Sequence, residues 1–155
     1  MENETQFAFV LIGDGQEKQN LINQAQNLKN VYFLPSVVKK SVPSVLKMFD
    51  FLYIGWNKSK LYRFGISPNK VYDYMMSGKP IIHSVDAAND DVALAKCGIS
   101  VEAENPKAIY NAILELSNKS QQEIEKIGEN GKKYVLQNND YSVLAKIFLE
   151  VIENC

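Results

Sequence analysis

Residues 65–83 of this 155-residue chain read GISPNKVYDYMMSGKPIIH, and the stretch predicts a helix followed by a buried strand. Ser67 is a favourable N-cap residue, and Pro68 suits the first helical position, where its missing N–H is not needed. Gly78 is expected to end the helix in a left-handed conformation, and Pro80 prevents the helix from continuing. The apolar residues that follow Pro80 then form the strand.

The start of this helix has the features of an anion-binding site. The first amides of a helix lack intrahelical partners and lie at the positive end of its dipole, where anions are stabilised. Lys70 places a cation in the first turn, and the dipole disfavours a cation there unless an anion joins it. The stretch therefore predicts a helix that binds a phosphate at its N-terminus.

Apolar runs alternate with helical patterns along the rest of the chain. The continuous run at 7–12 is typical of a parallel strand covered on both faces, and further strands are expected at 31–34, 51–54, 80–83 and 99–101. Helices are expected at 16–28, 42–49, 67–78, 106–116, 121–137 and 141–152. This alternation predicts one α/β domain, residues 1–155, with a Rossmann-like, doubly wound parallel sheet of about five strands and helices on both faces.

Composition excludes several classes of protein. The chain has 17 Lys and Arg against 18 Asp and Glu, so its charge favours no nucleic-acid partner. No apolar run approaches the roughly 20 residues of a membrane-spanning helix, and the polar residues 1–5 do not resemble a secretory signal. The two cysteines, Cys97 and Cys155, have no metal or redox spacing, which predicts a reduced, cytoplasmic protein without a metal site.

The unusual residues gather at one edge of the predicted sheet, the carboxyl ends of the strands, where such sheets bind ligands. In the turn at residues 13–15, Gly13 and Gly15 permit positive φ angles and a close backbone approach. The loop 55–65 mixes aromatic residues with cations. Of these cations, Arg63 is the best suited to a bidentate phosphate contact.

Each of these features also has a structural interpretation. Lys70 and Asp73 are three residues apart, so they are placed to form a surface ion pair. Asp14 is placed to cap the next helix, and the loop 55–65 is a solvated basic loop if Trp56 and Phe64 pack into the core.

Helical geometry also divides the key helix into two faces. Val71, Tyr72, Met75 and Met76 are expected to pack on the sheet as core residues, which leaves Asp73 on the other face with Lys70.

No nucleophile with an adjacent base is apparent, so no catalytic residue is assigned. His83 is the single histidine, nothing links it to Cys97, and a histidine after an apolar strand is more often structural than functional. The residues Asn89, Asp90 and Asp91 are expected to cap a short helix rather than to bind a metal. This pattern suits group transfer, in which positioning and stabilisation of a leaving group supply much of the catalysis.

Ser-Pro-Asn-Lys at 67–70, followed by Asp-Tyr-Met-Met-Ser-Gly-Lys-Pro at 73–80, resembles the nucleotide-binding segment of family four (group 1) glycosyltransferases. The common form there is Glu, seven residues, then Glu-Ala-Met-Ala-x-Gly-x-Pro; here Gly65 stands at the first acid and Asp73 at the second. The variant resembles a subgroup of surface-polysaccharide transferases without the first acid, so no role is carried over for that acid. Gly-Asp-Gly at 13–15 resembles a turn of the same family.

The resemblance implies the C-terminal, donor-binding half of a GT-B enzyme that transfers a sugar from a UDP- or GDP-sugar with net retention and needs no cofactor. Asp73 would then accept hydrogen bonds from the donor ribose, while Ser67, Asn69, Lys70 and the nearby backbone amides would form the diphosphate site.

The resemblance also implies what the full enzyme would contain. The N-terminal acceptor domain and the first strand and helix of the C-terminal domain lie outside this sequence, which is therefore expected to be an excised domain or a gene fragment that is inactive alone. Expected partners are that N-terminal domain and a polysaccharide or lipid-linked acceptor, at the inner face of a bacterial membrane in capsule or lipopolysaccharide synthesis. The alternative is a non-catalytic nucleotide-binding or protein-interaction module that keeps the fold.

Overall fold

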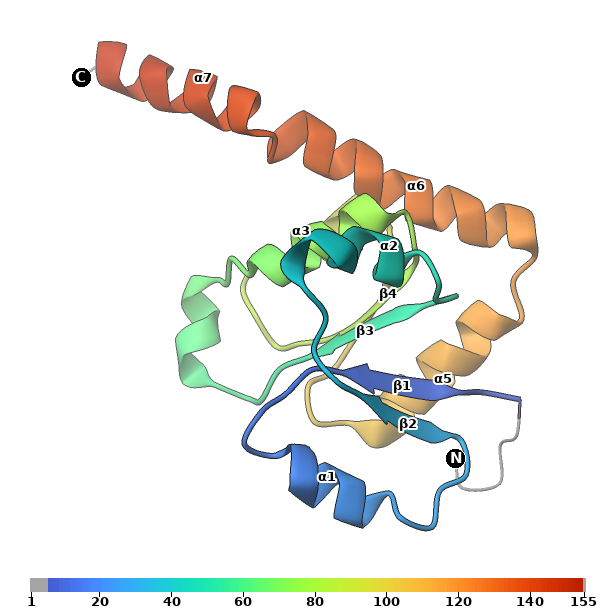
Figure 1. The fold of residues 1–155 in the computed structure, drawn as a ribbon. Coiled ribbons are helices and arrows are strands. Elements are labelled where there is room, and N and C mark those ends of the chain that lie inside the picture. The colour runs from blue at the N-terminus through green and yellow to red at the C-terminus, as the bar shows by residue number, and fades with distance from the viewer. Residues whose placement is uncertain (1–5, 155) are drawn as a thin grey trace. The chain divides into compact units, whose positions relative to one another are not determined.

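The computed structural model describes residues 6–154 and divides the chain into two compact units, residues 1–42 and residues 43–155 (Figure 1). Each unit contains its own parallel sheet, with two strands in the first and three in the second. The α/β, Rossmann-like fold class is confirmed, and the five expected strands are all present.

The first unit is a strand–helix–strand motif. Its strands β1 (Phe9–Ile12) and β2 (Val31–Leu34) pair in parallel, and the first residue of one lies opposite the first residue of the other. Helix α1 (Lys18–Gln24) connects them, and the 3₁₀ helix η1 (Lys39–Ser41) follows β2. α1 is shorter than the predicted 16–28 because it has no side-chain cap and buries no residue. β1 likewise contains no fully buried residue, which differs from the predicted fully covered strand.

The second unit is built on strands β3 (Leu52–Gly55), β4 (Ile81–Ser84) and β5 (Gly98–Val101), which run parallel in the order β3-β4-β5. Each begins within one residue of its predicted start. β4 pairs on both sides, and all of its residues are buried, as expected of a central strand in a parallel sheet.

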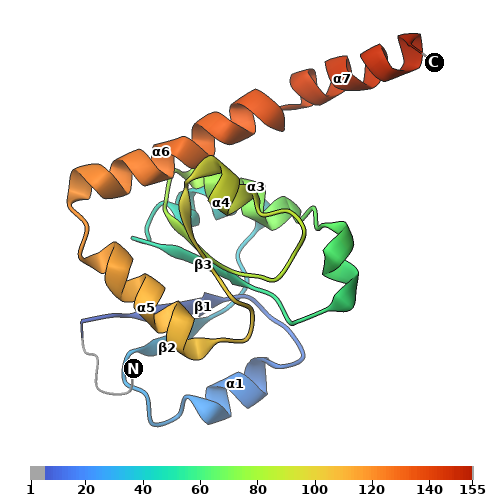
Figure 2. The ribbon, with the colours of Figure 1, turned by 180° about the vertical axis from the view of Figure 1, so that it is seen from behind.

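Helices cover both faces of this three-stranded sheet (Figure 2). α3, α4 and α6 pack together over one face, while α5 packs against β4 and β5 from the other. The helical segments of this unit, beginning at the boundary, are α2 (Val42–Leu46), η2 (Lys60–Phe64), α3 (Asn69–Ser77), α4 (Asp91–Ala95), α5 (Pro106–Ser117), α6 (Gln121–Asn138) and α7 (Tyr141–Glu153).

Two glycines bring α6 close to α3. A Cβ on Gly128 would collide with the carbonyl oxygen of Gly78, which ends α3 with a φ of 73° as predicted, and a Cβ on Gly131 would lie 3.2 Å from the Cα of Met75. Met75 is fully buried as a result. Met76 is 38% exposed, so its assignment to the core was wrong. The helix turns Met76 away from the sheet.

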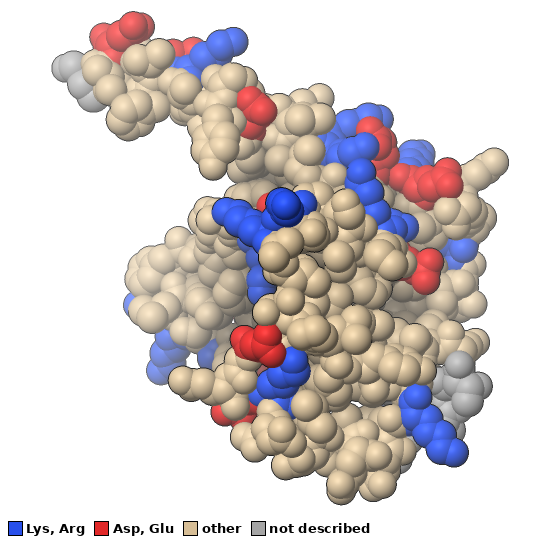
Figure 3. Space-filling model, viewed as in Figure 1, with Lys and Arg blue, Asp and Glu red and all other residues tan. Residues whose placement is uncertain are grey.

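The last helix has an exposed apolar surface. α7 buries none of its residues, and large apolar side chains such as Phe148 and Ile152 are more than half exposed. In Figure 3 charged side chains of both signs cover α6, while α7 shows a mostly uncharged surface. None of the helices in the described part of the chain is long and apolar enough to cross a membrane.

Candidate functional site

The N-terminus of α3 lies one residue later than the sequence predicts. α3 begins at Asn69, and Pro68, not Ser67, occupies the N-cap position with extended backbone angles (φ −86°, ψ 118°). Proline fixes only its own φ, so it fits the residue before the helix as well as the first residue within it. Ser67 is exposed and caps no amide of α3.

The absence of a side-chain cap separates α3 from the helices that follow it. Side chains cap the N-termini of the next four helices, from Asp90, Asn105, Ser120 and Asp140. At α3 the N–H groups of Asn69 and Lys70 donate to no acceptor among residues 6–154. These amides are therefore available to an external anion.

The charged side chains on the first turns of α3 are also unengaged. Lys70 and Asp73 are exposed, and neither forms a hydrogen bond or an ion pair within the described chain. The surface ion pair that the spacing allowed is therefore not present. A free cation and a free carboxylate remain on the helix that carries the unpaired amides.

The connection from β3 to α3 presents a second cation. Arg63 lies in η2, exposed, with its guanidinium carbon 4.6 Å from the centre of the Phe64 ring. Phe64 is 76% exposed, so the interpretation that placed it in the core was wrong, whereas Trp56 does pack against the core cluster. Lys58 is engaged, because its Nζ lies 2.6 Å from Glu102 and this contact raises the pKa of the lysine.

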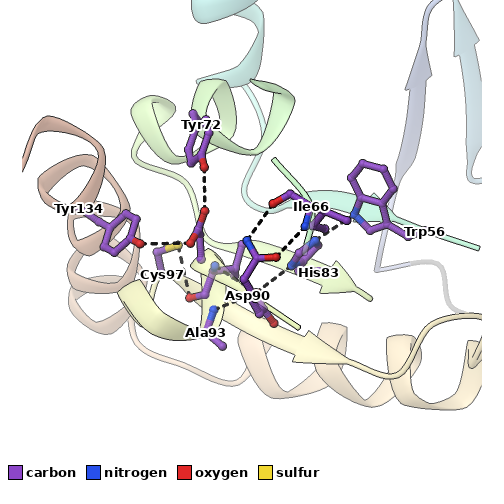
Figure 4. Close-up of polar contacts among 11 residues, drawn as sticks. Trp56, Ile66, Tyr72, His83, Asp90, Ala93, Cys97 and Tyr134 are labelled. Atoms are coloured by element: carbon purple, nitrogen blue, oxygen red, sulfur yellow. Dashed lines mark hydrogen bonds and ion pairs between the residues drawn. The ribbon is translucent and has the colours of Figure 1, made fainter. Parts of the chain in front are cut away.

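His83 is the centre of a buried polar chain (Figure 4). The indole N–H of Trp56 donates to its Nε2 over 3.0 Å, and its Nδ1 lies 2.9 Å from Oδ1 of Asp90. An indole can only donate, so Nε2 is the acceptor and the imidazole proton lies on Nδ1. His83 is 2% exposed and both of its nitrogens are used. These contacts agree with the structural interpretation of this histidine.

Asp90 connects this series of hydrogen bonds to α4. Its carboxylate accepts the N–H groups of Val92 and Ala93, which confirms it as the cap of the short helix. Burial raises the pKa of the Asp90 carboxyl, but the hydrogen bonds with His83 and the Ala93 amide help to outweigh burial, and the pKa lies below its usual range. Asp90 is therefore a carboxylate that holds His83 in one tautomer.

The neighbouring Asn89 has a role that sequence reasoning missed. Its side-chain amide forms two hydrogen bonds with the backbone of Ile66: Oδ1 accepts the Ile66 N–H at 2.7 Å, and Nδ2 donates to the Ile66 carbonyl at 2.8 Å. The two residues are 23 positions apart, so no local pattern indicates the contact.

The glycine turn at residues 13–15, predicted to allow a close backbone approach to the nucleotide, lies in the first unit. Gly13 has a φ of 141°, which explains the glycine, while a Cβ on Gly13 or Gly15 would meet nothing within 4 Å. Both line an open depression of about 210 Å³. Asp14 does not cap α1 as proposed. It accepts hydrogen bonds from Lys18 and from the Ser36 amide, which hold its pKa well below the usual range.

The thiol of Cys97 is held in the second unit in its protonated form. Cys97 is fully buried, and burial raises the pKa of its thiol to about 12. The described residues contain no cluster of His, Cys, Asp or Glu that could hold a metal.

The chain matches a known protein family. The family model described as "Glycosyl transferases group 1" matches residues 1–119. This chain is a group 1 glycosyltransferase sequence. The family was expected from the motif at 67–80, which forms the start and the body of α3. None of the curated protein sequences is significantly similar to the chain.

Solved structures place this group 1 glycosyltransferase chain in the GT-B fold. HepE of Anabaena, in complex with UDP-glucose, matches 97% of the chain at 16% identity and a TM-score of 0.73. WaaG, a glycosyltransferase involved in lipopolysaccharide biosynthesis, matches 90% at 14% identity and a TM-score of 0.67. A sucrose-phosphate synthase of Thermosynechococcus elongatus matches 94% at 13% identity, also with a TM-score of 0.67. The chain spans 42%, 36% and 39% of the lengths of these proteins, respectively.

Proposed function

We propose that this chain is the donor nucleotide-sugar-binding part of a retaining glycosyltransferase that uses a UDP- or GDP-sugar. The observation that carries the proposal is the start of α3, where the Asn69 and Lys70 amides, the Lys70 ammonium and the Asp73 carboxylate are all without partners in the described chain. Membership of the group 1 glycosyltransferases supports it, as does the fold shared with HepE, whose structure contains UDP-glucose.

The chemistry required at such a site is stabilisation of a diphosphate leaving group. As the bond between sugar and diphosphate breaks, negative charge grows on the leaving oxygen. Donors that are already in place stabilise that charge without rearranging. In this proposal the α3 amides and Lys70 bind the diphosphate, with Asn69 and Ser67 adding polar contacts and Arg63 providing a bidentate cation from η2.

Asp73 has a separate role in this proposal. An ionised carboxylate accepts two hydrogen bonds at once, which matches the two hydroxyls of a ribose. The predicted role of Gly13 and Gly15, a close backbone approach to the donor, belongs to the first unit and stays a prediction; the open depression in front of both glycines is compatible with it.

The wider function follows from the family and is part of the same proposal. The sugar would pass to a polysaccharide or lipid-linked acceptor held by a preceding domain, in a cytoplasmic enzyme that meets the inner face of a bacterial membrane. We also propose that the transferred group is a hexosyl group. Residues 1–155 would together form one nucleotide-sugar-binding domain.

The experiment is an NMR titration of the chain with UDP, GDP and CMP. We expect one nucleotide to shift the amide signals of Asn69, Lys70 and their neighbours, and Lys70→Ala to weaken that binding by roughly tenfold or more, as for a charge-assisted hydrogen bond. Lys107→Ala is the matched control. Lys107 is also exposed and second in its helix, but the α5 start is capped by Asn105.

Two outcomes would count against the proposal. If Lys70→Ala and Lys107→Ala weaken nucleotide binding equally, the start of α3 is not the binding site. If no nucleotide binds at millimolar concentration, the proposed site is contradicted.

A second candidate function is a non-catalytic module that binds a nucleotide or another protein. The exposed apolar surface of α7 favours a contact with a further protein surface. Adding UDP-glucose and GDP-mannose to the full-length protein and measuring release of the nucleoside diphosphate separates the two. Transfer or slow hydrolysis supports the enzyme, whereas binding without turnover supports the module.

A further inference from the structure

The connection from β3 to α3, residues 56–66, contacts Glu102 and Glu104 through Lys58. Its start, middle and end are held by one other part of the chain. That part is the end of β4 with the connection to α4, residues 83–90. The contacts begin at Trp56, whose backbone N–H donates to the Ser84 carbonyl over 2.9 Å and whose indole N–H donates to His83. The start of the β3–α3 connection is therefore attached to β4 through both backbone and side chain.

The middle of the connection is attached next. The backbone N–H of Ala88 donates to the Tyr62 carbonyl over 3.0 Å, and the Tyr62 ring packs edge-on against Trp56 with 5.8 Å between ring centres. η2, which carries Arg63, therefore has a fixed position although Leu61 and Phe64 are more than 70% exposed.

The end of the connection is attached by Asn89. Its side chain satisfies both the N–H and the carbonyl of Ile66, the residue before Ser67. Gly65 precedes it with a φ of 98°, and a Cβ at Gly65 would lie 3.0 Å from Oδ1 of Asn89, so the chain bends tightly around the amide. Figure 4 shows Trp56 beside His83, and Ile66 next to the segment on which Asp90 is labelled.

Little space is left behind these contacts. A small cavity of about 10 Å³, lined by residues that include Ile66, Pro68, His83 and Asn89, lies between the two connections and has room for about one water molecule. The α3 start is therefore supported from behind by close packing, while its amides face outward without partners.

We propose that the β4–α4 connection positions the nucleotide site, with Asn89 as the positioning residue that sets the backbone at the start of α3 and Asp90 fixing the other end through His83 and Trp56. This inference rests on the proposed function of α3. Asn89 need not touch the nucleotide. It holds the Ile66 peptide, so the Asn69 and Lys70 amides are in place before the ligand arrives. A site ordered in advance loses less conformational entropy on binding.

The test compares three variants of the full chain, with UDP or whichever nucleotide the wild type binds as the probe. Asn89→Ala removes both hydrogen bonds to Ile66 and should raise the dissociation constant about tenfold. Asn89→Asp keeps the acceptor for the Ile66 N–H and loses the donor, so it should recover part of the affinity. Asn89 is exposed, so neither change disturbs the core.

Asn130→Ala is the matched control. Asn130 is partly buried, and its amide also donates to a distant backbone carbonyl, that of Lys96 at 3.1 Å, but this contact joins α6 to the end of α4. Amide hydrogen exchange of the free protein provides the second measurement. The Ile66 amide should exchange faster in Asn89→Ala and remain slow in Asn130→Ala.

The outcomes separate the inference from the function on which it rests. A wild type that binds UDP while Asn89→Ala binds it equally well would overturn the positioning role. So would equal weakening by Asn89→Ala and Asn130→Ala, or an Ile66 amide that stays protected in Asn89→Ala. A wild type that binds no nucleotide contradicts the proposed function itself, and the positioning role falls with it.

Discussion

The connections β1–α1 and β3–α3 both follow a parallel strand and both carry a cation near a predicted phosphate site, but they use that cation differently. Lys18 folds back at the first connection, where its Nζ donates to the Gly13 carbonyl, the Leu34 carbonyl and Asp14 at 2.8, 3.1 and 2.8 Å. Lys70 at the second connection has no partner in the described chain.

The difference lies in what holds the backbone. In the first connection Lys18 itself holds the backbone and so acts as a brace. Its charge is therefore already paired within the chain. The second connection is held mainly by residues 83–90 from elsewhere in the chain. Lys58 pairs with Glu102, but Arg63 in the connection and Lys70 at the start of α3 form no ion pair among the described residues. A cation is available to a ligand only where something else has stabilised the loop.

The largest effect should come from breaking the external support of the second connection. Asp90→Ala leaves the buried Nδ1–H of His83 without its acceptor and removes the cap of α4, so we expect a loss of about 3 kcal/mol of unfolding free energy. Urea denaturation followed by Trp56 fluorescence measures it, since Trp56 is the single tryptophan of the chain.

The control for this variant is Asp140→Ala, which removes only the cap of α7 and should cost about 1 kcal/mol. Equal losses in the two variants would mean that the link to His83 contributes nothing.

The next prediction tests whether Asp73, a charged group on α3 without an ion-pair partner in the described chain, binds a ligand. Asp73→Ala should weaken nucleotide binding by roughly thirtyfold, as expected for hydrogen bonds to a charged group, and leave stability unchanged because Asp73 has no partner in the described chain. Isothermal titration calorimetry gives the affinity. A nucleotide without ribose hydroxyls should bind the wild type and the variant equally. If the wild type binds that nucleotide more tightly than the variant does, the ribose contact is refuted.

A smaller effect tests the brace in the first connection. Lys18→Met removes the main cause of the depressed pKa of Asp14, so this pKa should rise toward its usual range while the hydrogen bond from Ser36 keeps it somewhat lowered. In the wild type the contribution of Asp14 to stability is present above the ordinary carboxyl pKa of about 3.9 and is lost as the pH falls through the lowered value. NMR titration of the carboxyl carbon follows the change, and an unshifted Asp14 would show that Lys18 is not a brace.

The smallest effects distinguish the two glycines of that turn. Gly13→Ala forces a side chain into a φ of 141° and should cost about 1 kcal/mol or more, whereas Gly15→Ala places its methyl group in open space and should change stability by less than about 0.5 kcal/mol. Thermal unfolding measures both. If Gly15→Ala nevertheless weakens nucleotide binding, the open space in front of Gly15 is where the ligand approaches; unchanged binding would contradict that prediction.

Sequence reasoning succeeded where one local signal dominates. Continuous apolar runs predicted all five strands, and β2 matches its predicted limits. Pro106 marked the start of α5 correctly, and the amphipathic pattern marked the starts of α6 and α7 correctly. The start of α3 was displaced by one residue because proline is equally acceptable at two adjacent positions.

What sequence reasoning missed depends on contacts between distant segments. The hydrogen bonds of Asn89 to Ile66 and the close approach of Gly128 to Gly78 join positions many residues apart, and nothing local indicates them. Phe64 was placed in the core by its apolar character and Met76 by its expected face of the helix, yet both are exposed. Apolar residues are common on protein surfaces, so the apolar character of a single residue does not by itself predict that the residue is buried.

The central claim is that the start of α3 binds a diphosphate, and comparing UDP with uridine tests it most directly. Calorimetry would give both affinities for the wild type and for Lys70→Ala. We predict that the wild type binds UDP far more tightly than uridine and that Lys70→Ala removes much of this preference while leaving uridine affinity unchanged. A preference for UDP that is the same in both proteins would contradict the account, because the diphosphate would then be held somewhere other than α3.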